Sequence, residues 1–434
     1  MDTLVIGFAL FSMFFGAGNL IFPPTLGFTY KSDFLIAAIS FCITGVGLTL
    51  LAVLAVAKKK GDIFSFSKLS GNLLGKILTI LVILCIGPVF AIPRTSATTY
   101  EVISAADFSV NKYLFAFLFF ALTLYFSIVQ GRVIDIIGKF LTPLLLITLF
   151  TLIVKSVITP ISPIPNFQGD GVVNNSLLEG YNTMDAIAAL VFTPTIAKSV
   201  IAKGHTEEKD YMKTLIGSAI IAMIGLSVIY IALSYIGATS SSLGKDLSRV
   251  DLLVLASSKL LGNTGKLVLS LAMALACLTT SIGLVSSVSE IFSNMTDKKI
   301  GYKPFVVLIC IISALISIFG VETIVQLAIP ILGFIYPIVI VFIFFTFFEN
   351  VIKSKKIIVA TTAVTVFFTL IESINNMAVT VENVFGIENL QISKFTNFLN
   401  DFLNFFPLYK LGFIWLIPAV IVFIISIIVF KKER

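Results

Sequence analysis

Charged residues are scarce in this chain: Asp, Glu, Lys and Arg make up only 12% of its 434 residues. A soluble domain keeps roughly a quarter of its residues charged, so this shortage excludes a soluble globular protein. Apolar residues reach 58%, and the mean hydropathy is +1.06. Apolar runs of roughly 17 to 25 residues, long enough to cross a bilayer, recur along the chain. The composition therefore indicates a protein that spans a membrane many times.

Cysteine and histidine are also few. The four cysteines, Cys42, Cys85, Cys277 and Cys310, all lie inside apolar runs, where free cysteine packs as a small hydrophobe. This placement excludes an extracellular disulfide framework. The single histidine, His205, lies among charged residues between two apolar runs, and we expect it to be a solvated loop residue.

Catalytic motifs are missing as well: the sequence has no HExxH, no CxxC, no phosphate-binding loop and no GxSxG. Nothing favours hydrolysis or ATP-driven transport, and we expect that the protein is not an enzyme. The net charge of +7 does not point to nucleic acid, because the basic residues form short clusters between apolar runs.

We expect about twelve membrane-spanning helices in one transmembrane domain, residues 1–434. Residues 1–158 form a first five-helix repeat in this interpretation, residues 172–348 a second, and residues 356–430 two additional helices. The first run lacks a basic leader and a cleavage site, so we interpret it as a retained helix rather than a signal peptide. The predicted spans lie near residues 4–29, 33–57, 75–103, 112–130, 134–158, 172–200, 211–238, 264–293, 303–320, 324–348, 356–378 and 411–430.

The basic residues also predict the orientation of these helices. Gaps on the cytoplasmic side of a membrane carry an excess of Lys and Arg. If the N-terminus is cytoplasmic, 20 of the 30 basic residues fall in the inner gaps or at the C-terminus. We therefore expect both termini in the cytoplasm, which agrees with an even number of spans.

Two predicted spans contain interrupting segments at corresponding places. The first contains Gly16-Ala17-Gly18-Asn19, and the sixth contains Glu179-Gly180-Tyr181-Asn182-Thr183. Five helices form each repeat, so the second repeat is inverted, and paired broken helices in inverted repeats mark transport sites near the membrane midplane. The alternative is that the glycines form a small-residue packing patch, which is common in membrane helices.

An interrupted helix can bind a small zwitterion. Unwound backbone survives in a membrane only where it lines a cavity or binds a ligand. One half-helix presents N–H groups, which favour a carboxylate, and the other presents C=O groups, which favour a cation. An amino acid supplies both charges, and Na⁺ suits the remaining carbonyls.

Three consecutive hydroxyl residues, Thr279, Thr280 and Ser281, lie in the eighth span shortly after Ala276. Their oxygens, together with backbone carbonyls, suit a hard monovalent cation. The alternative is that these hydroxyls only bond to their own helix or join helix pairs.

Ionisable residues inside spans are costly and therefore mark functional sites. Arg94 and Glu101 lie in the third span, Glu179 and Asp185 flank the second break, and Glu372 lies in the eleventh span. One hypothesis is that Arg94 pairs with Glu179 or Glu101 as an outer gate, and the alternative is a static ion pair. Asp185 could complete a cation site or relay a proton, and the sequence leaves both open.

Four segments together resemble the bacterial branched-chain amino acid:cation symporters of the amino acid–polyamine–cation superfamily. They are FFGAGNLIFPP at 14–24, GPVFAIPRTSATTYE at 87–101, EGYNTMDAIAALVF at 179–192 and ACLTTSIGL at 276–284. The resemblance implies an all-α membrane fold similar to the neurotransmitter–sodium symporters. Five-plus-five inverted repeats, with helices 1 and 6 broken and two helices added, characterise that fold.

The resemblance also implies the ligands of the site. The substrate's amino and carboxylate groups would be bound by backbone around Phe14, Gly16, Ala17 and Gly18, and Tyr181, Asn182 and Thr183 would face it. A Na⁺ would be bound by Ser12, Phe15, Ala276, Thr279 and Thr280, and Asn19 resembles the ligand of a second Na⁺. The register leaves open whether Thr279–Thr280 or Thr280–Ser281 supplies the hydroxyl pair.

We therefore expect a Na⁺-coupled symporter that imports leucine, isoleucine and valine by alternating access, in the bacterial cytoplasmic membrane. Its partners would be these substrates and the lipid bilayer, without nucleic acid, and Na⁺ would be the coupling ion in place of any cofactor. One rival is an H⁺-coupled symporter that uses Asp185. A rival of another class is an ion channel, and a membrane enzyme or sensor is a third. The oligomeric state stays open.

Overall fold

The computed structural model describes residues 2–59, 61–63, 71–128, 137–245, 247–352, 354–386 and 390–430. Throughout these residues the regular secondary structure is helical, without a strand. The prediction of an all-α protein is therefore confirmed. Residues 431–434, the end that we predict to be cytoplasmic, lie outside the described residues.

The chain divides into two compact units. Unit 1 comprises Met1–Ala57 and Leu84–Val321, and unit 2 comprises Lys58–Ile83 and Glu322–Arg434. Unit 1 combines helices from both predicted repeats, so its boundaries differ from the predicted ones, and the repeat symmetry stays a prediction. Every residue of the site described below belongs to unit 1.

The helices of unit 1, apart from α14, lie within or overlap predicted spans, and several are joined by short π-helical turns. In chain order they are α1 (Asp2–Phe14), α2 (Ala17–Tyr30), α3 (Phe34–Cys42), the π-helix η2 (Ile43–Gly47), α4 (Leu48–Lys58), the π-helix η4 (Cys85–Val89), α7 (Ala91–Ala105), α8 (Lys112–Ser127), the π-helix η5 (Ile137–Leu141), α10 (Thr142–Ile158), α11 (Val172–Asn182), α12 (Asp185–Ala202), α13 (Glu208–Thr239), α14 (Arg249–Leu261), α15 (Asn263–Met295) and α16 (Tyr302–Ser317).

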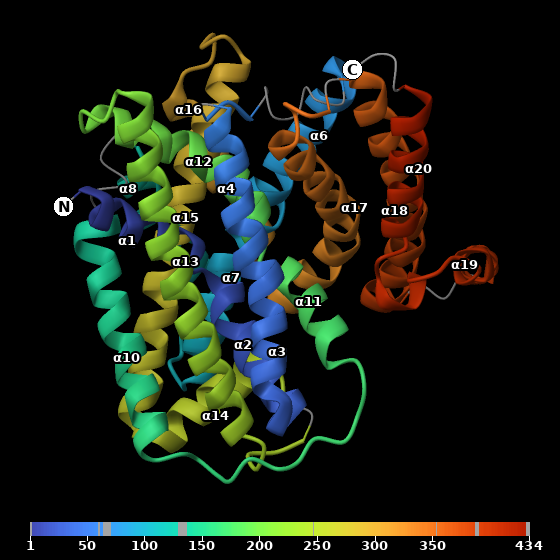
Figure 1. Ribbon diagram of the computed structural model, residues 1–434. Helices are drawn as coiled ribbons and strands as arrows, with labels where there is room; N and C mark the ends of the chain where they lie inside the picture. Colours follow the sequence, from blue (N-terminus) through green and yellow to red (C-terminus); the bar gives the residue numbers. More distant parts are fainter. Residues whose placement is uncertain are drawn as a thin grey trace. The chain divides into compact units, whose positions relative to one another are not determined.

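Unit 2 holds most of the remaining helices. They are α6 (Asn72–Leu84), α17 (Val321–Phe347), α18 (Lys355–Phe385), α19 (Leu390–Asn404), the 3₁₀-helix η6 (Tyr409–Leu411) and α20 (Leu416–Val429). Helix α18 packs against both α19 and α20 (Figure 1). A buried apolar cluster that includes Phe345, Ile357 and Trp415 forms a core of unit 2.

Helices lie at each of the twelve predicted spans, and in the described residues eight helical stretches are long and apolar enough to cross a membrane. The total of twelve spans stays a prediction. Two helices, α14 and α19, lie in segments that we predicted as gaps outside the membrane.

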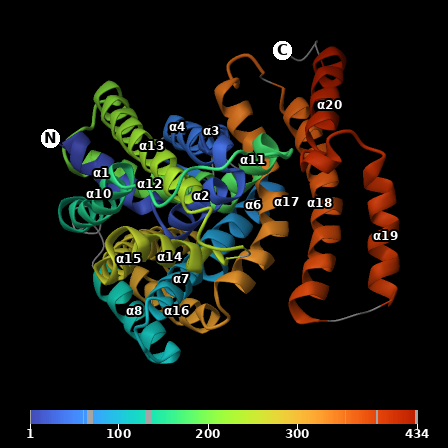
Figure 2. The ribbon, with the colours of Figure 1, turned by 90° about the horizontal axis from the view of Figure 1, so that it is seen from below.

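Two groups of helices meet in unit 1. In the first group α1, α2, α3, α11, α12 and α13 pack on one another, and in the second α7, α8, α15 and α16 do so (Figures 1 and 2). The groups touch where α1 and α12 contact α15 and where α2 contacts α7. Both helix breaks lie at this junction.

Within the first group, α2 and α13 touch backbone to backbone. A Cβ added at Gly27 would lie 1.8 Å from the carbonyl oxygen of Ser234, and one at Gly237 would lie 1.9 Å from that of Pro24. Only glycine fits at either position. This pair of glycines sets the closest approach of the two helices.

Ion pairs and hydrogen bonds gather the segments between helices at two ends of unit 1. At one end Lys203 and His205, between α12 and α13, lie 3.9 Å and 3.7 Å from the carboxylate of Asp2. At the other end of α13, the Ser162 hydroxyl donates to the Thr239 carbonyl at 2.7 Å. The N-terminus and the gap after α12 thus share one end, as the predicted topology requires.

Candidate functional site

The first break is shorter than the sequence predicts. Helix α1 ends at Phe14 and α2 begins at Ala17, so only Phe15 and Gly16 are non-helical. The Asn19 Oδ1 accepts a hydrogen bond from the Gly16 N–H at 3.1 Å. Asn19 therefore stabilises the start of α2, and the predicted extension of the break through Gly18 and Asn19 is wrong.

The second break lies later than predicted. Helix α11 continues to Asn182, and the chain turns at Thr183 and Met184, which has a left-handed φ of 67°. Gly180, the residue on which the prediction rested, is helical. A Cβ there would lie 2.0 Å from Thr44 Oγ1 and 3.0 Å from the Phe41 carbonyl oxygen, so Gly180 serves close packing against α3 and η2.

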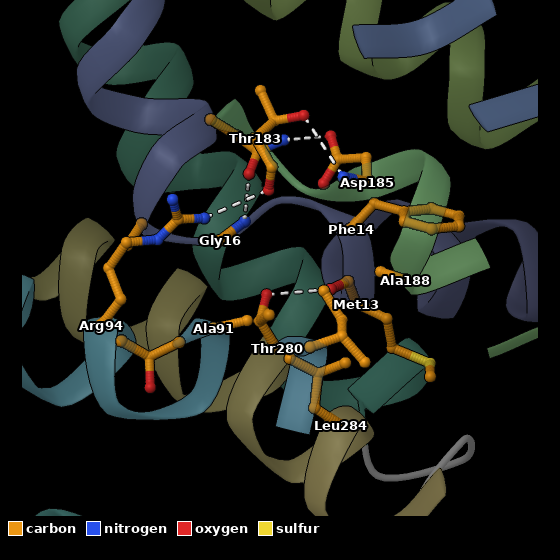
Figure 3. A pocket seen from close by; sticks show the side chains of 14 residues that line it. Met13, Phe14, Gly16, Ala91, Arg94, Thr183, Asp185, Ala188, Thr280 and Leu284 are labelled. Carbon is orange, nitrogen blue, oxygen red and sulfur yellow. Dashed lines mark hydrogen bonds between the residues drawn. The ribbon is translucent and has the colours of Figure 1, made fainter. Parts of the chain in front are cut away.

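A small cavity lies between the two breaks, and Figure 3 shows its lining. Thr183, Asp185 and Ala188 reach it from the second break and α12, and Thr280 and Leu284 reach it from α15. The lining residues are Met13, Phe14, Gly16, Ala17, Asn19, Ile86, Ala91, Arg94, Thr95, Thr183, Asp185, Ala188, Thr280 and Leu284.

The cavity brings together four of the seven residues predicted to bind substrate: Phe14, Gly16, Ala17 and Thr183. Gly18, Tyr181 and Asn182 are not in its lining. Gly18 lies behind it, where an added Cβ would be 3.1 Å from Arg94 Nη2. Tyr181 is buried in α11. Asn182 contributes its backbone carbonyl to the contact with Arg94 that is described next.

Arg94 holds the end of α11. Its Nη1 donates to the Asn182 carbonyl at 2.7 Å and its Nη2 donates to the Thr183 carbonyl at 3.1 Å. These carbonyls lie at a helix C-terminus, where the backbone dipole favours a positive charge. The guanidinium also lies over the Phe22 ring, 5.9 Å from its centroid. Arg94 therefore joins the second helix group to the break in the first (Figure 3).

Glu179 is paired with a different arginine from the one that we predicted. Its Oε1 accepts from Arg249 Nη2 of α14 at 3.2 Å, and its Oε2 accepts from Asn182 Nδ2 at 3.0 Å. Arg249 also covers the Phe22 ring, at 4.7 Å from its centroid. The sequence missed this partner because it lies in a segment interpreted as a gap.

The other predicted gate carboxylate, Glu101, lies at the far end of α7. Its Oε1 accepts a hydrogen bond from the backbone N–H of Val321 at 2.8 Å. Both residues belong to unit 1, so this hydrogen bond connects the end of α7 to the segment after α16. This contact gives Glu101 a structural role.

Asp185 lies buried at the start of α12, with 2% of its surface exposed. Its Oδ2 accepts from Asn19 Nδ2 at 2.5 Å and from the Tyr230 hydroxyl at 3.2 Å. Asn19 Nδ2 also contacts the Tyr230 oxygen. Asp185 thus connects α2, α12 and α13. Asn19 uses its Nδ2 in these contacts and its Oδ1 in the bond to the Gly16 N–H. Its role as a second Na⁺ ligand stays a prediction.

The hydroxyls of α15 bind the end of α1. Thr279 Oγ1 donates to the Ser12 and Ala276 carbonyls, each at 2.9 Å, and accepts from Ser12 Oγ at 3.2 Å. Thr280 Oγ1 lies 2.9 Å from the Met13 carbonyl oxygen and 3.4 Å from that of Ser12. Four of the five residues predicted to bind Na⁺ therefore form one cluster of oxygen atoms: Ser12, Ala276, Thr279 and Thr280.

Two neighbours of this cluster are placed differently. Ser281 lies on another face of α15, where its Oγ is 3.4 Å from Thr123 Oγ1. The structure therefore presents Thr279 and Thr280 to α1. Phe15, the fifth predicted ligand, donates its N–H to the Phe11 carbonyl at 2.8 Å. The Thr280 hydroxyl donates its hydrogen bond to the carbonyl of Met13 rather than to that of Phe15.

Sequence reasoning missed part of the apolar wall. Met13, Ile86, Ala91, Ala188 and Leu284 line the cavity together with Thr95. Ile86 belongs to the π-helix η4, and Ala91 begins α7 after the irregular backbone at Gly87 and Pro88. The motif GPVFAIPRTSATTYE contained this signal, since Gly and Pro in a membrane helix mark a local deformation.

Comparison with known proteins identifies the family. The model of the family described as branched-chain amino acid transport protein matches residues 1–433. The chain is 35% identical to the branched-chain amino acid permease BraB of Bacillus subtilis, over 97% of this chain and 93% of that protein. It is 34% identical to BrnQ, the branched-chain amino acid permease of the same organism, over 96% of this chain and 94% of that protein.

Two solved structures have a similar fold. MhsT in complex with L-phenylalanine has a TM-score of 0.61 at 16% identity, covering 96% of this chain and 98% of that chain. A Na⁺-coupled sialic acid symporter in a substrate-bound outward-open state has a TM-score of 0.58 at 14% identity, covering 98% and 89%. These similarities confirm the predicted fold class. The match over the whole chain and the two permeases show that the chain belongs to the family of branched-chain amino acid transport proteins, which are multi-pass membrane transporters.

Proposed function

We propose that this transporter is a Na⁺-coupled symporter that imports leucine, isoleucine and valine by alternating access. One observation carries the choice of coupling ion: the oxygen cluster of Ser12, Ala276, Thr279 and Thr280 between α1 and α15. The cluster lies at the junction of the two helix groups, beside the cavity, which Thr280 also lines.

The cluster has the chemistry that Na⁺ prefers. Its members are two backbone carbonyls and three hydroxyls, all neutral oxygen ligands, and the bonded oxygens lie 2.9 to 3.4 Å apart. Each hydrogen bond between a hydroxyl and a carbonyl can be exchanged for a shared cation, since both oxygens carry lone pairs. A bound Na⁺ would therefore connect the end of α1 to α15.

This position explains how an ion gradient can drive transport. The cation would bind between helix groups that have to move relative to each other when the cavity changes the side to which it opens. A ligand shifts such an equilibrium only by its difference in affinity between the two states. Na⁺ supplies that difference if it binds the cluster in one arrangement of α1 and α15 and leaves it in the other.

The apolar wall supports the proposed substrates. Seven apolar residues line the same cavity as Thr183, Asp185 and Arg94, so an amino acid with an uncharged aliphatic side chain is favoured over a polar one. The related proteins BraB and BrnQ are branched-chain amino acid permeases, which supports this choice. The seven are Met13, Phe14, Ala17, Ile86, Ala91, Ala188 and Leu284.

The test is leucine uptake by the purified full chain in proteoliposomes. An inward Na⁺ gradient without a pH gradient should accumulate leucine above its external concentration, and a pH gradient without Na⁺ should not. Control liposomes with equal Na⁺ on both sides should only equilibrate. Accumulation driven by the pH gradient alone contradicts Na⁺ coupling.

H⁺ coupling is the second candidate, and Asp185 is the observation that favours it. Its carboxylate is buried beside the cavity and is bonded to Asn19 and Tyr230, a setting in which a proton could be taken up and released. In this case the pH gradient drives uptake, and Asp185→Asn abolishes accumulation while leaving leucine exchange. A channel would instead pass ions without leucine and without saturation.

A further inference from the structure

The cavity contains one positive and one negative side chain, both buried. Arg94 has 4% of its surface exposed and Asp185 has 2%, and both line the cavity in Figure 3. They come from different helix groups, Arg94 from α7 and Asp185 from α12. Isolated buried charges are costly, so a cavity that holds both signs is suited to a ligand that carries both.

We infer that Arg94 binds the α-carboxylate of the substrate and that Asp185 binds its α-ammonium group. The inference rests on the proposed function, because it takes the cavity as the place where the branched-chain amino acid binds. It differs from the expectation drawn from the family resemblance, in which the backbone around Phe14, Gly16, Ala17 and Gly18 binds both charged groups of the amino acid.

The positive side of the cavity consists of Arg94 and the start of α2. The Asn182 and Thr183 carbonyls fix the orientation of the guanidinium, at 2.7 Å and 3.1 Å. Gly18, in the first turn of α2, lies beside Nη2. The N–H groups of a helix N-terminus favour an anion, so guanidinium and helix act on the same carboxylate.

The negative side consists of Asp185 and its two supports. The side-chain groups that bond to its Oδ2, the Asn19 amide and the Tyr230 hydroxyl, are neutral, so they orient the carboxylate without cancelling its charge. An ammonium group of the substrate would give this carboxylate a positive partner bonded to it directly. The apolar wall, including Ile86 and Leu284, is left for the aliphatic side chain.

The test compares three ligands on the full chain. Leucine carries both charges, 4-methylpentanoate lacks the ammonium group, and 3-methylbutylamine lacks the carboxylate. On wild type, each ligand is tested by its competition with radiolabelled leucine. On the variants Asp185→Asn and Arg94→Gln, the binding of each radiolabelled ligand is measured directly. Glu179→Gln and Arg249→Gln are matched controls, because this carboxylate and this guanidinium pair with each other and are not in the cavity lining.

In wild type, leucine should bind about 100-fold more tightly than either analogue, since each analogue leaves one buried charge without its partner. In Asp185→Asn the advantage of leucine over 4-methylpentanoate should fall to less than about threefold, while its advantage over 3-methylbutylamine persists. Arg94→Gln should show the converse. Both controls should keep the wild-type ratios.

Unchanged ratios in both variants overturn the inference. Loss of all binding also overturns it. Asp185→Asn should still bind 4-methylpentanoate, which lacks the ammonium group, and Arg94→Gln should still bind 3-methylbutylamine, which lacks the carboxylate. A second pair, Asp185→Ser and Arg94→Met, removes the same charges with different packing, in case a first variant misfolds. If wild type does not bind leucine at all, the proposed function has failed, which is a separate result.

Discussion

The Thr280 hydroxyl of α15 donates a hydrogen bond to the carbonyl oxygen of Met13, one residue before the end of α1, at 2.9 Å. This bond crosses between the two helix groups of unit 1. It also places a hydroxyl oxygen at the edge of the cavity, next to the broken backbone at Phe15 and Gly16.

Thr280→Ala should weaken the dependence of leucine uptake on Na⁺. Loss of one oxygen from the cluster should raise the Na⁺ concentration for half-maximal uptake at least about tenfold, because a metal site with one donor fewer loses affinity on that scale. Uptake measured over a range of Na⁺ concentrations checks this. Ser281→Ala is the matched control: its hydroxyl faces Thr123 instead, so its Na⁺ dependence should not change. An equal effect of the two substitutions would refute the assignment.

Leucine, isoleucine and valine should compete with similar affinity. One methylene in an apolar pocket changes binding by only about 1–3 kcal/mol, so the three inhibition constants should lie within about 100-fold of one another. Alanine should inhibit much more weakly, since it leaves most of the wall uncovered. Inhibition of radiolabelled leucine uptake measures these constants. Saturable lysine uptake that leucine does not inhibit would contradict an apolar side-chain pocket.

Gly180→Ala should destabilise the protein, although Gly180 lies outside the cavity lining. The new Cβ would overlap Thr44 Oγ1 at 2.0 Å, and this hydroxyl is held by its bond to the Leu177 carbonyl at 2.7 Å. Overpacking of this kind costs about 1–3 kcal/mol. Thermal unfolding in detergent checks it, with Gly333→Ala as the control, since a Cβ there meets nothing within 4 Å. Equal stability of both variants would mean that α11 does not pack on η2 in this way.

The pair of Glu179 and Arg249 should contribute modestly to transport. Reversal of one charge, Glu179→Arg, places two arginines together and should slow uptake by about fivefold, as expected for loss of a partly exposed ion pair. The double reversal, Glu179→Arg with Arg249→Glu, should recover most of it. If the double reversal restores leucine binding and neither variant changes the rate of leucine uptake, the pair is a static link rather than a gate.

The orientation can be tested by chemical labelling. Asp170 lies in the exposed segment before α11 and Glu208 begins α13 at the other end of the helix bundle of unit 1. In intact cells an impermeant thiol reagent should label Asp170→Cys and leave Glu208→Cys unlabelled, because basic residues keep the second segment in the cytoplasm. The reverse pattern would invert the predicted topology.

The sequence was most informative where physics admits few solutions. Long apolar runs have to be helical in a membrane, so the helices follow the predicted spans closely. The family resemblance, rather than the spacing of the hydroxyls, implied that Ser12 lies beside α15, and Ser12 and Thr279 do lie together.

Other features depend on contacts that no local pattern encodes. Gly180 indicated a break, but glycine serves close packing as readily as unwinding, and the chain turns at Met184, a residue type with no preference for a left-handed backbone. Arg94 was expected to pair with Glu179 or Glu101, and its bonds to two carbonyls at a helix end were not foreseen. Arg249 was overlooked because it lies in a segment without membrane character.

The close approach of α2 and α13, in which Gly27 lies against Ser234 and Gly237 against Pro24, has a mechanical consequence. Two helices whose backbones touch cannot slide along each other, because no side chain separates them to absorb the shift. We therefore expect α2 and α13 to move as one rigid body when the transporter changes state. Spin labels on these two helices should keep a constant separation through the cycle, while a label on α2 and one on α15 should move apart and together with each turnover.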